Sequence, residues 1–163
     1  MLTYENERSD IAIVFGTAAL DHFARNRQLR PSSAEAGGQL FATFDDGVAH
    51  IDLATGPRPT DHRSRYVFRP DRRSEQLEIK TMFMRGLHYV GDWHTHPTQI
   101  PQPSIEDLRN IRAAVRQSVH ELKGFLLVVV GNAPFPVGLS VTLDTGDDAL
   151  RLQVAATSTA STL

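Results

Sequence analysis

The chain has 163 residues, 40% of them hydrophobic, and its 17 lysines and arginines against 19 acids leave a net charge of −2. This length and composition are typical of one globular domain with its own core, and the charge does not favour a nucleic-acid partner. Because the chain has no cysteine, disulfide scaffolds, iron–sulfur clusters and cysteine nucleophiles are excluded. Any metal must therefore bind His, Asp, Glu or main-chain oxygen.

Apolar periodicity and turn residues predict that strands and helices alternate along the chain. In chain order they are strand 11–15, helix 17–28, strands 39–44 and 48–53, loop 54–65, strand 66–68, helix 71–85, strand 87–95, loop 98–103, helix 104–119, and strands 125–130, 136–143 and 149–155. Thr17 is the expected cap of the first helix, and Asp45-Asp46-Gly47 is typical of a hairpin turn. We therefore expect one α/β domain with a mixed sheet over residues 1–156 and a flexible tail, 157–163.

No segment predicts a membrane span or a secretion signal. The longest apolar run, residues 125–130, is far shorter than the ~20 residues that a helix needs to cross a bilayer. The first eight residues carry acids where a signal peptide needs a basic start and an apolar stretch. We expect a soluble, cytoplasmic protein.

Two histidines at the end of the 87–95 strand are candidate metal ligands. His94 and His96 stand at positions i and i+2, so both side chains point to the same face of the strand. Their Cα atoms are then ~6.5–7 Å apart, which lets two imidazoles converge on one ion. Such a pair is as typical of an ordinary strand end as of a metal site, so a third ligand must decide.

Asp107, near the start of the next helix, is the candidate third ligand. One interpretation is structural, because Ser104 and Asp107 have the spacing of a capping box. However, Asp107 also begins an apolar stripe with Ile111 and Val115, flanked by Leu108 and Val119, and so faces the sheet. A carboxylate on that face is costly unless it is paired or binds a metal. Two His and one Asp with an open fourth position are typical of catalytic zinc.

These residues resemble the signature of the JAB/MPN (JAMM) metallopeptidases. The shared pattern is His94-Thr95-His96-Pro97, six residues, and then Ser104-x-x-Asp107, with the upstream segment Glu35-Ala-Gly-Gly-Gln-Leu before a strand. The order of elements is similar over roughly residues 10–155. The string Tyr89-Val-Gly-Asp-Trp before the His pair is similar to bacterial members found on mobile elements and in antiphage operons.

The resemblance implies a single MPN/JAB-like domain with a curved mixed sheet and about three helices. It also implies hydrolysis of a peptide or isopeptide bond by water that zinc activates. His94, His96 and Asp107 would bind Zn²⁺, Glu35 would be the general base, and Ser104 would donate a hydrogen bond to the oxyanion. The implied substrate is a ubiquitin-like protein or the C-terminal tail of a conjugated protein. The Gly37-Gly38 pair fits either close approach of a substrate or an ordinary bulge.

Two rival functions share some of these features. Asp92-x-His94-x-His96 is similar to the opening of the amidohydrolase barrels, but such barrels run to ~250 residues and this chain ends 67 residues after His96. Asp92 is then a solvated acid or one that supports a ligand. The second rival is a non-catalytic MPN module that only binds a partner, and metal content separates it from an enzyme.

Substrate contacts can be predicted only coarsely. The C-terminal tail of a substrate is most simply bound as an added strand. Loops 54–65 and 98–103 are the expected walls of the channel for this tail, and Trp93 is expected to pack in the core. The basic segment from Arg58 to Arg73 predicts a solvated edge or a contact for an acidic partner rather than DNA. The identity of the substrate and the oligomeric state are unknown from the sequence.

Overall fold

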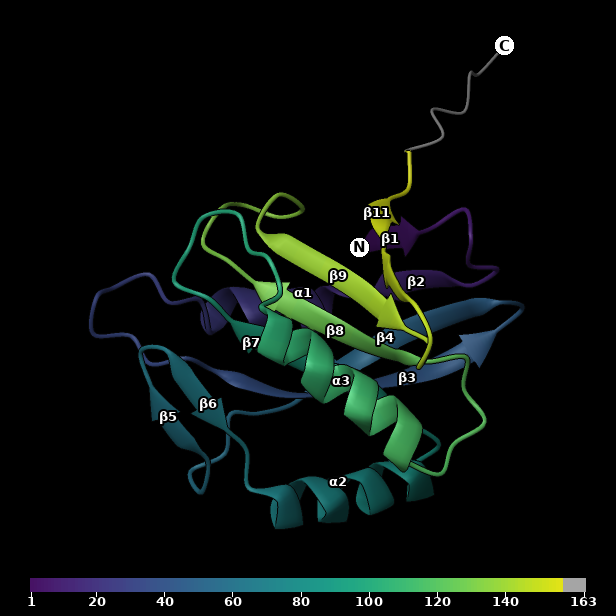
Figure 1. Cartoon of the computed structure of the whole chain (residues 1–163), viewed down its shortest axis with the longest axis horizontal. Coiled ribbons are helices and arrows are strands. Elements are labelled where there is room, and N and C mark those ends of the chain that lie inside the picture. The colour runs from purple at the N-terminus through teal and green to yellow at the C-terminus, as the bar shows by residue number, and fades with distance from the viewer. Residues whose placement is uncertain (157–163) are drawn as a thin grey trace.

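Residues 1–156, the part of the chain that this computed structural model describes, form one large mixed sheet, a small two-stranded sheet and helices on both faces (Figure 1). The elements are β1 (Leu2–Glu5), β2 (Ala12–Phe15), α1 (Thr17–Arg25), β3 (Gly37–Asp45), β4 (Val48–Ala54), β5 (His62–Ser64), β6 (Val67–Arg69), α2 (Arg72–Met84), β7 (His88–Thr95), α3 (Ile105–Gln117), β8 (Phe125–Val130), β9 (Leu139–Asp144), β10 (Ala149–Arg151) and β11 (Gln153–Val154). The expected tail, 157–163, lies outside the described residues. Within residues 1–156, no helix is long and apolar enough to cross a membrane.

The large sheet has the order β10-β9-β8-β7-β3-β4-β2-β1-β11. Only the β2–β4 and β7–β8 pairs are parallel, and the other neighbours run antiparallel. Parallel neighbours need a crossover, and α3 supplies it between β7 and β8. The expected α/β class with a mixed sheet is confirmed, and the start of α3 is brought to the carboxyl end of β7.

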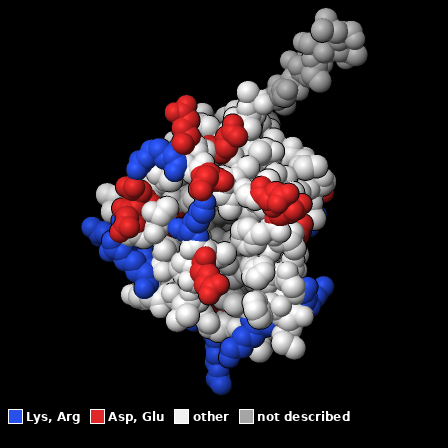
Figure 2. Space-filling model, turned by 90° about the vertical axis from the view of Figure 1, so that its right-hand side faces the viewer, with Lys and Arg blue, Asp and Glu red and all other residues white. Residues whose placement is uncertain are grey.

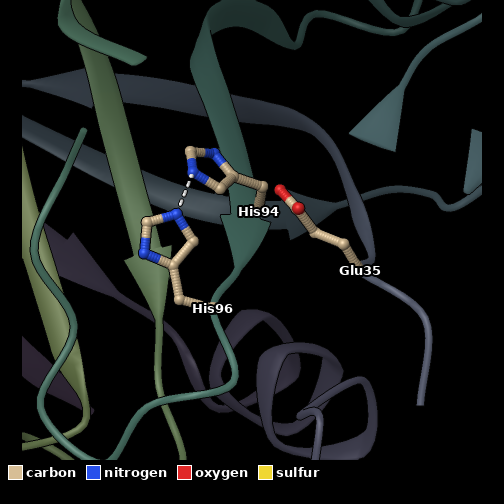
Figure 3. Close-up of side chains that lie close together, drawn as sticks. All are labelled: Glu35, His94 and His96. Atoms are coloured by element: carbon tan, nitrogen blue, oxygen red, sulfur yellow. Dashed lines mark hydrogen bonds between the residues drawn. The ribbon is translucent and has the colours of Figure 1, made fainter. Parts of the chain in front are cut away.

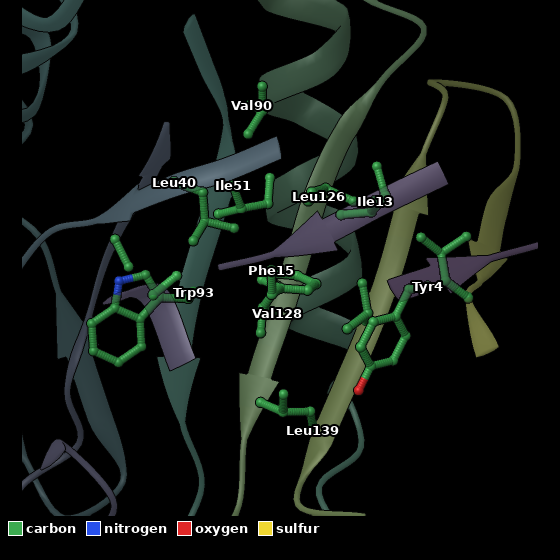
Figure 4. Packing of buried hydrophobic residues seen from close by; sticks show 14 of the residues in the cluster. Tyr4, Ile13, Phe15, Leu40, Ile51, Val90, Trp93, Leu126, Val128 and Leu139 are labelled. Carbon is green, nitrogen blue, oxygen red and sulfur yellow. The ribbon is translucent and has the colours of Figure 1, made fainter. Parts of the chain in front are cut away.

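Apolar side chains fill both faces of β8, which explains why all six of its residues are buried. Leu126, Val128 and Val130 join the main core, which includes Phe15, Phe23 and Trp93 (Figure 4). The alternate residues Phe125, Leu127 and Val129 pack under α3 against Ile111 and Val115. Because successive side chains of a strand point to opposite faces, β8 packs against the main core on one face and against α3 on the other.

Several predicted boundaries are wrong. Helix α1 is capped by Gly16 rather than Thr17, without a side-chain hydrogen bond, and it ends at Arg25 because Asn26 leaves the helical conformation. Strand β1 was not predicted, and β5 lies inside the segment expected to be a loop. Strand β9 begins three residues after Pro136. The hairpin turn is as predicted, since Asp46 and Gly47 both have positive φ.

The Gly37-Gly38 pair lets the protein's own chain approach β3. A Cβ added at Gly38 would lie 1.7 Å from the carbonyl oxygen of Thr55, and one at Gly37 would lie 2.6 Å from the ring of Phe68. The bulge in the β3–β7 pairing lies farther along, between Leu40 and Phe41. The glycines therefore fit the loop after β4 and strand β6 tightly against β3 rather than leaving room for a substrate.

Candidate metal centre

Three side-chain atoms meet where β7 ends and α3 begins. Nε2 of His94 lies 3.2 Å from Nε2 of His96, and Oδ2 of Asp107 lies 3.1 Å from the first and 3.4 Å from the second. A tetrahedral zinc ion with ligand bonds of ~2.0–2.1 Å needs donor atoms ~3.3 Å apart. The spacing of these three atoms therefore fits one small divalent cation.

Strand β7 and its neighbours fix the two histidines. His94 is in register with Gly37 of β3 and Val129 of β8. The main-chain N–H of His96 donates to the carbonyl of Val130 at 2.9 Å, so it extends the pairing by one step. Trp93, which precedes His94, points to the opposite face, is 1% exposed and donates from Nε1 to the carbonyl of Thr55, as expected for a core residue.

Helix α3 places Asp107. The main-chain N–H of Ser104 donates to Asp107 Oδ2 at 2.8 Å, and the N–H of Asp107 donates to Ser104 Oγ at 3.0 Å. The capping box and the inward-facing acid are therefore two properties of the same side chain. Ile111 and Val115 continue its face as predicted, but Val119 is fully exposed because the chain leaves the helix at Ser118.

Glu35 lies on the other side of His94 (Figure 3). Its carboxylate and the two imidazoles have donor atoms within 4.8 Å of one another. The main chain of Glu35 is held from β5: its N–H donates to the carbonyl of Ser64 at 2.7 Å, and Arg63 Nε donates to its carbonyl at 2.8 Å. Two hydrogen bonds to β5 thereby hold the main chain of this loop residue.

Gln28 and Thr95 also hold this loop, a role that was not predicted. The N–H of Ala36 donates to Thr95 Oγ1 at 2.9 Å, and Thr95 Oγ1 donates to Gln28 Oε1 at 2.8 Å. Gln28, only 2% exposed, donates in turn to the carbonyls of Ser33 and Arg65. The only sequence signal for this role is the position of Thr95 between the two histidines.

The surroundings of Glu35 and Asp107 shift the pKa values of the two acids in opposite directions. Burial raises the pKa of Glu35, although the charges of His94 and His96 oppose the shift. Burial also acts to raise the pKa of Asp107, but hydrogen bonds from both histidines outweigh it and hold this pKa far below its usual range. Asp107 is thus an ionised, ligand-like carboxylate, and Glu35 is the better proton acceptor.

Ser104 is an exposed N-cap. Its Oγ accepts from the N–H of Asp107, which leaves its own hydroxyl proton free to donate elsewhere. The structure thus brings Glu35, His94, His96 and Asp107 together, whereas Ser104 is joined to this group through Asp107.

A pocket of about 110 Å³ is lined by three of these residues, Glu35, His94 and Asp107, and extends to Arg72 and Glu75 of α2. Asp92 and Glu75 lie on its wall, away from the donor atoms. Asp92 accepts from the hydroxyl of Tyr89 at 3.0 Å, so it is a hydrogen-bonded acid rather than a solvated one. Burial and the charge of Asp92 raise the pKa of Glu75 to about 7.

A family model and curated relatives match this chain. The family described as prokaryotic homologs of the JAB domain matches residues 17–143. A CD-NTase/cGAS isopeptidase from Enterobacter hormaechei is 27% identical over 93% of this chain and 86% of its own length, and one from Vibrio cholerae is 28% identical over 84% and 86%. A probable metalloprotease from Sinorhizobium fredii is 38% identical over 50% of this chain and 53% of its own length.

Solved structures show the same fold. A protein from Desulfitobacterium hafniense superposes with a TM-score of 0.60 over 85% of this chain and 88% of its own, at 21% identity. A protein from Salinibacter ruber gives 0.52 over 92% and 95%, also at 21% identity. The likeness to these two proteins concerns the arrangement of strands and helices alone.

Proposed function

Because this chain belongs to the family of prokaryotic homologs of the JAB domain, we propose that it is a zinc isopeptidase that cuts the bond between the C-terminal tail of a protein and an amine. The predicted membership of the JAMM metallopeptidases is confirmed, and the chain is a hydrolase of that type. To this family membership we add three proposals: that the metal is zinc, that the bond cut is an isopeptide bond, and that the substrate is the C-terminal tail of a protein. The observation that carries it is the convergence of His94, His96 and Asp107 beside Glu35.

Zinc fits the donor set better than a hard cation does. Two imidazole nitrogens and one carboxylate oxygen, at donor separations of 3.1–3.4 Å, suit four-coordinate zinc with one open position. Magnesium and calcium take more ligands, and mainly oxygen. When bound, Zn²⁺ would polarise the scissile carbonyl and lower the pKa of an attacking water.

The chain's own residues then handle the proton. Glu35, held by β5 and raised in pKa by burial, accepts a proton from the attacking water on its carboxylate. The water oxygen bonds to the carbonyl carbon, the carbon–nitrogen bond breaks, and Glu35 returns the proton to the leaving amine. Ser104 is proposed to donate its free hydroxyl proton to the oxyanion that develops in between.

The expected channel for the tail has one wall that the contacts support. Strand β5, within the segment 54–65, is bonded to Glu35 through Ser64 and Arg63, so a tail lying along it would pass the general base. The loop 98–103 is held by hydrogen bonds from Asn132 and Ala133 to the carbonyls of Thr98 and Gln99. We propose that a tail ending in small residues binds between these segments as an added strand.

Two kinds of protein could supply the tail. One is the ubiquitin-like protein that the sequence resemblance implies, and the other is a CD-NTase, since three relatives named CD-NTase/cGAS isopeptidase match this chain over 72–93% of its length. In either case we propose that the bond cut joins the C-terminal carboxyl of that protein to an amine. We place the reaction in the cytoplasm, where a cysteine-free protein needs no oxidising environment.

The test is cleavage of matched conjugates. Each candidate protein is joined through its C-terminus to the Nζ of a lysine peptide, and products are identified by mass spectrometry with wild type and with Glu35→Gln. We expect release of the free C-terminus by wild type only, and blocking when the last tail residue is changed from Gly to Leu. If neither conjugate is cut and no metal binds, the non-catalytic binding module is the correct function.

A further inference from the structure

The basic segment of the sequence forms a surface whose charges are not balanced. Eight of the 17 lysines and arginines lie between residues 58 and 85, together with only four acids. Within residues 1–156, ion pairs join two of the eight to acids, namely Arg58 to Glu78 and Arg72 to Glu75. The acids of the segment are therefore largely unable to neutralise its cations.

Internal contacts occupy those four acids. Asp61 accepts from the main-chain N–H groups of Arg58 and Asp71. Asp71 caps α2 by accepting from Arg73 and Ser74. Glu75 is 4% exposed, and Glu78 bonds to Thr55 and Arg58 beneath the helix. Glu75 is thus buried and Glu78 pairs with Arg58, whereas the half-exposed Asp61 and Asp71 accept from main-chain N–H groups rather than from the basic side chains, so the exposed charge along α2 is mainly positive.

The same side of α2 is also apolar. Leu77, Phe83 and Met84 are 67%, 63% and 86% exposed, although they belong to a well-formed helix. The only residue of this helix that is fully buried is Glu75. We call the outer surface of the helix, with its C-cap Arg85, the α2 face; it consists of Arg73, Leu77, Lys80, Phe83, Met84 and Arg85. Large apolar side chains gathered in the open mark interaction sites.

The α2 face begins where helix α2 meets the metal centre. Figure 1 shows α2 and the β5–β6 sheet side by side at the lower edge of the molecule, below the large sheet. Figure 2, which looks at the right-hand side of Figure 1, shows blue side chains and no red ones at the lowest part of the molecule, where α2 lies. Arg72 at the start of α2 lines the pocket that reaches His94 and Asp107, and Arg63 of β5 bonds to Glu35. The start of α2 therefore adjoins the centre, and the α2 face extends from there along the helix, within reach of a folded substrate that follows α2.

We propose that the α2 face binds an acidic protein surface that carries exposed apolar side chains, and that this surface belongs to the folded body of the substrate. The inference rests on the proposed function, which accounts only for the binding of the substrate's C-terminal tail. Charge complementarity selects the acidic partner, because cations surround the exposed Leu77, Phe83 and Met84. Nucleic acid is less suited, since phosphates would pair with the cations but leave those three side chains in water.

The experiment uses a small folded carrier protein with one exposed helix, made in three versions. The first presents glutamates around a leucine stripe, the second presents lysines around the same stripe, and the third presents glutamates without leucines. Binding to the full chain carrying Glu35→Gln is measured by fluorescence anisotropy, so that no turnover is needed. A 20-base-pair DNA duplex is the fourth probe. We expect the first carrier to bind about tenfold more tightly than each of the others.

Variants locate the contact. Leu77→Ser with Met84→Ser should remove the advantage given by the leucines, and Lys80→Gln with Arg85→Gln should remove that given by the glutamates. Arg8→Gln with Arg151→Gln removes the same charge elsewhere and should leave all affinities unchanged. Equal binding of the three carriers, tighter binding of the duplex, or insensitivity to the α2 variants would overturn the proposal.

A cleavage assay separates this inference from the proposed function. The first carrier is given a cleavable tail, and its kcat/KM is compared with that of the free tail peptide. We expect the α2 variants to lower kcat/KM about tenfold for the carrier and not for the peptide. If neither is cut while the carrier still binds, the proposed function fails and the docking surface stands. If both are cut at equal rates and the carrier does not bind, the reverse holds.

Discussion

Asp107 has a role in the capping box and a proposed role as metal ligand, and a pair of substitutions can separate the two. Its carboxylate accepts from the N–H of Ser104 in the capping box and also lies 3.1 Å and 3.4 Å from the two histidine nitrogens. Asp107→Ala removes both functions. Asp107→Asn keeps a side-chain oxygen for the N–H of Ser104 but removes the negative charge that a cation needs.

The expected magnitudes follow from those contacts. Without metal, Asp107→Ala should lower the free energy of unfolding by about 1 kcal/mol, the usual cost of a lost cap, whereas Asp107→Asn should cost less. In a domain of this size, 1 kcal/mol corresponds to a change of ~2–4 °C in Tm. Zinc at 100 times its Kd should stabilise wild type by ~2.7 kcal/mol, hence by ~5–10 °C, and both variants by much less.

Thermal unfolding followed by fluorescence, in EDTA and again with zinc, measures both quantities. Ser104→Ala is the matched control, because it removes the Oγ that accepts from Asp107 while leaving the donor set complete. It should lose the capping free energy but keep the full zinc response. If Asp107→Asn were stabilised by zinc as much as wild type, Asp107 would be only a helix cap and the assignment of the third ligand would be wrong.

Three further substitutions test other parts of the structure. Glu35→Gln should keep the zinc-induced rise in Tm but lower the rate of cleavage by ~10²–10⁴, as loss of a general base does; loss of metal would make Glu35 a ligand instead. For Glu75→Gln, urea unfolding at pH 4.5 and pH 8 is compared. The folded-state pKa of about 7 exceeds the ordinary 4.5, so wild type loses stability as the pH rises through this range, and the variant should become more stable by up to ~3 kcal/mol at pH 8 only; a difference independent of pH would refute this. Gly38→Ala should cost ~3 kcal/mol in urea unfolding, since its Cβ would lie 1.7 Å from Thr55 oxygen, and a neutral effect would contradict the tight fit.

Local periodicity was enough to predict three of the four residues of the candidate centre. His94 and His96 follow from the alternation of a strand, and Asp107 from the helical stripe with Ile111 and Val115. Glu35 could be found only through the family resemblance, because a loop acid has no periodicity. Its position depends on contacts with Ser64 and Arg63, some 30 residues away, which no local pattern encodes.

The elements that were not predicted also depend on contacts between distant parts of the chain. Strand β5 has three exposed residues and no apolar pattern, so only its pairing with β6 defines it. Strand β1 is short and is defined by its pairing with β2 and β11, the second of which lies about 150 residues away. The acids Glu75 and Asp92 were not recognised as neighbours, because α2 and β7 are brought together only by the tertiary structure.

The most direct measurement is the dependence of isopeptide cleavage on metal. The chain is stripped with chelator, zinc is returned in known fractions, and the rate of cleavage is measured beside the bound metal at each step. One centre made of His94, His96 and Asp107 predicts no activity without metal and a linear rise that ends at one zinc per chain. Full activity in the stripped chain, or binding of one zinc without any cleavage, would contradict a metal-dependent isopeptidase.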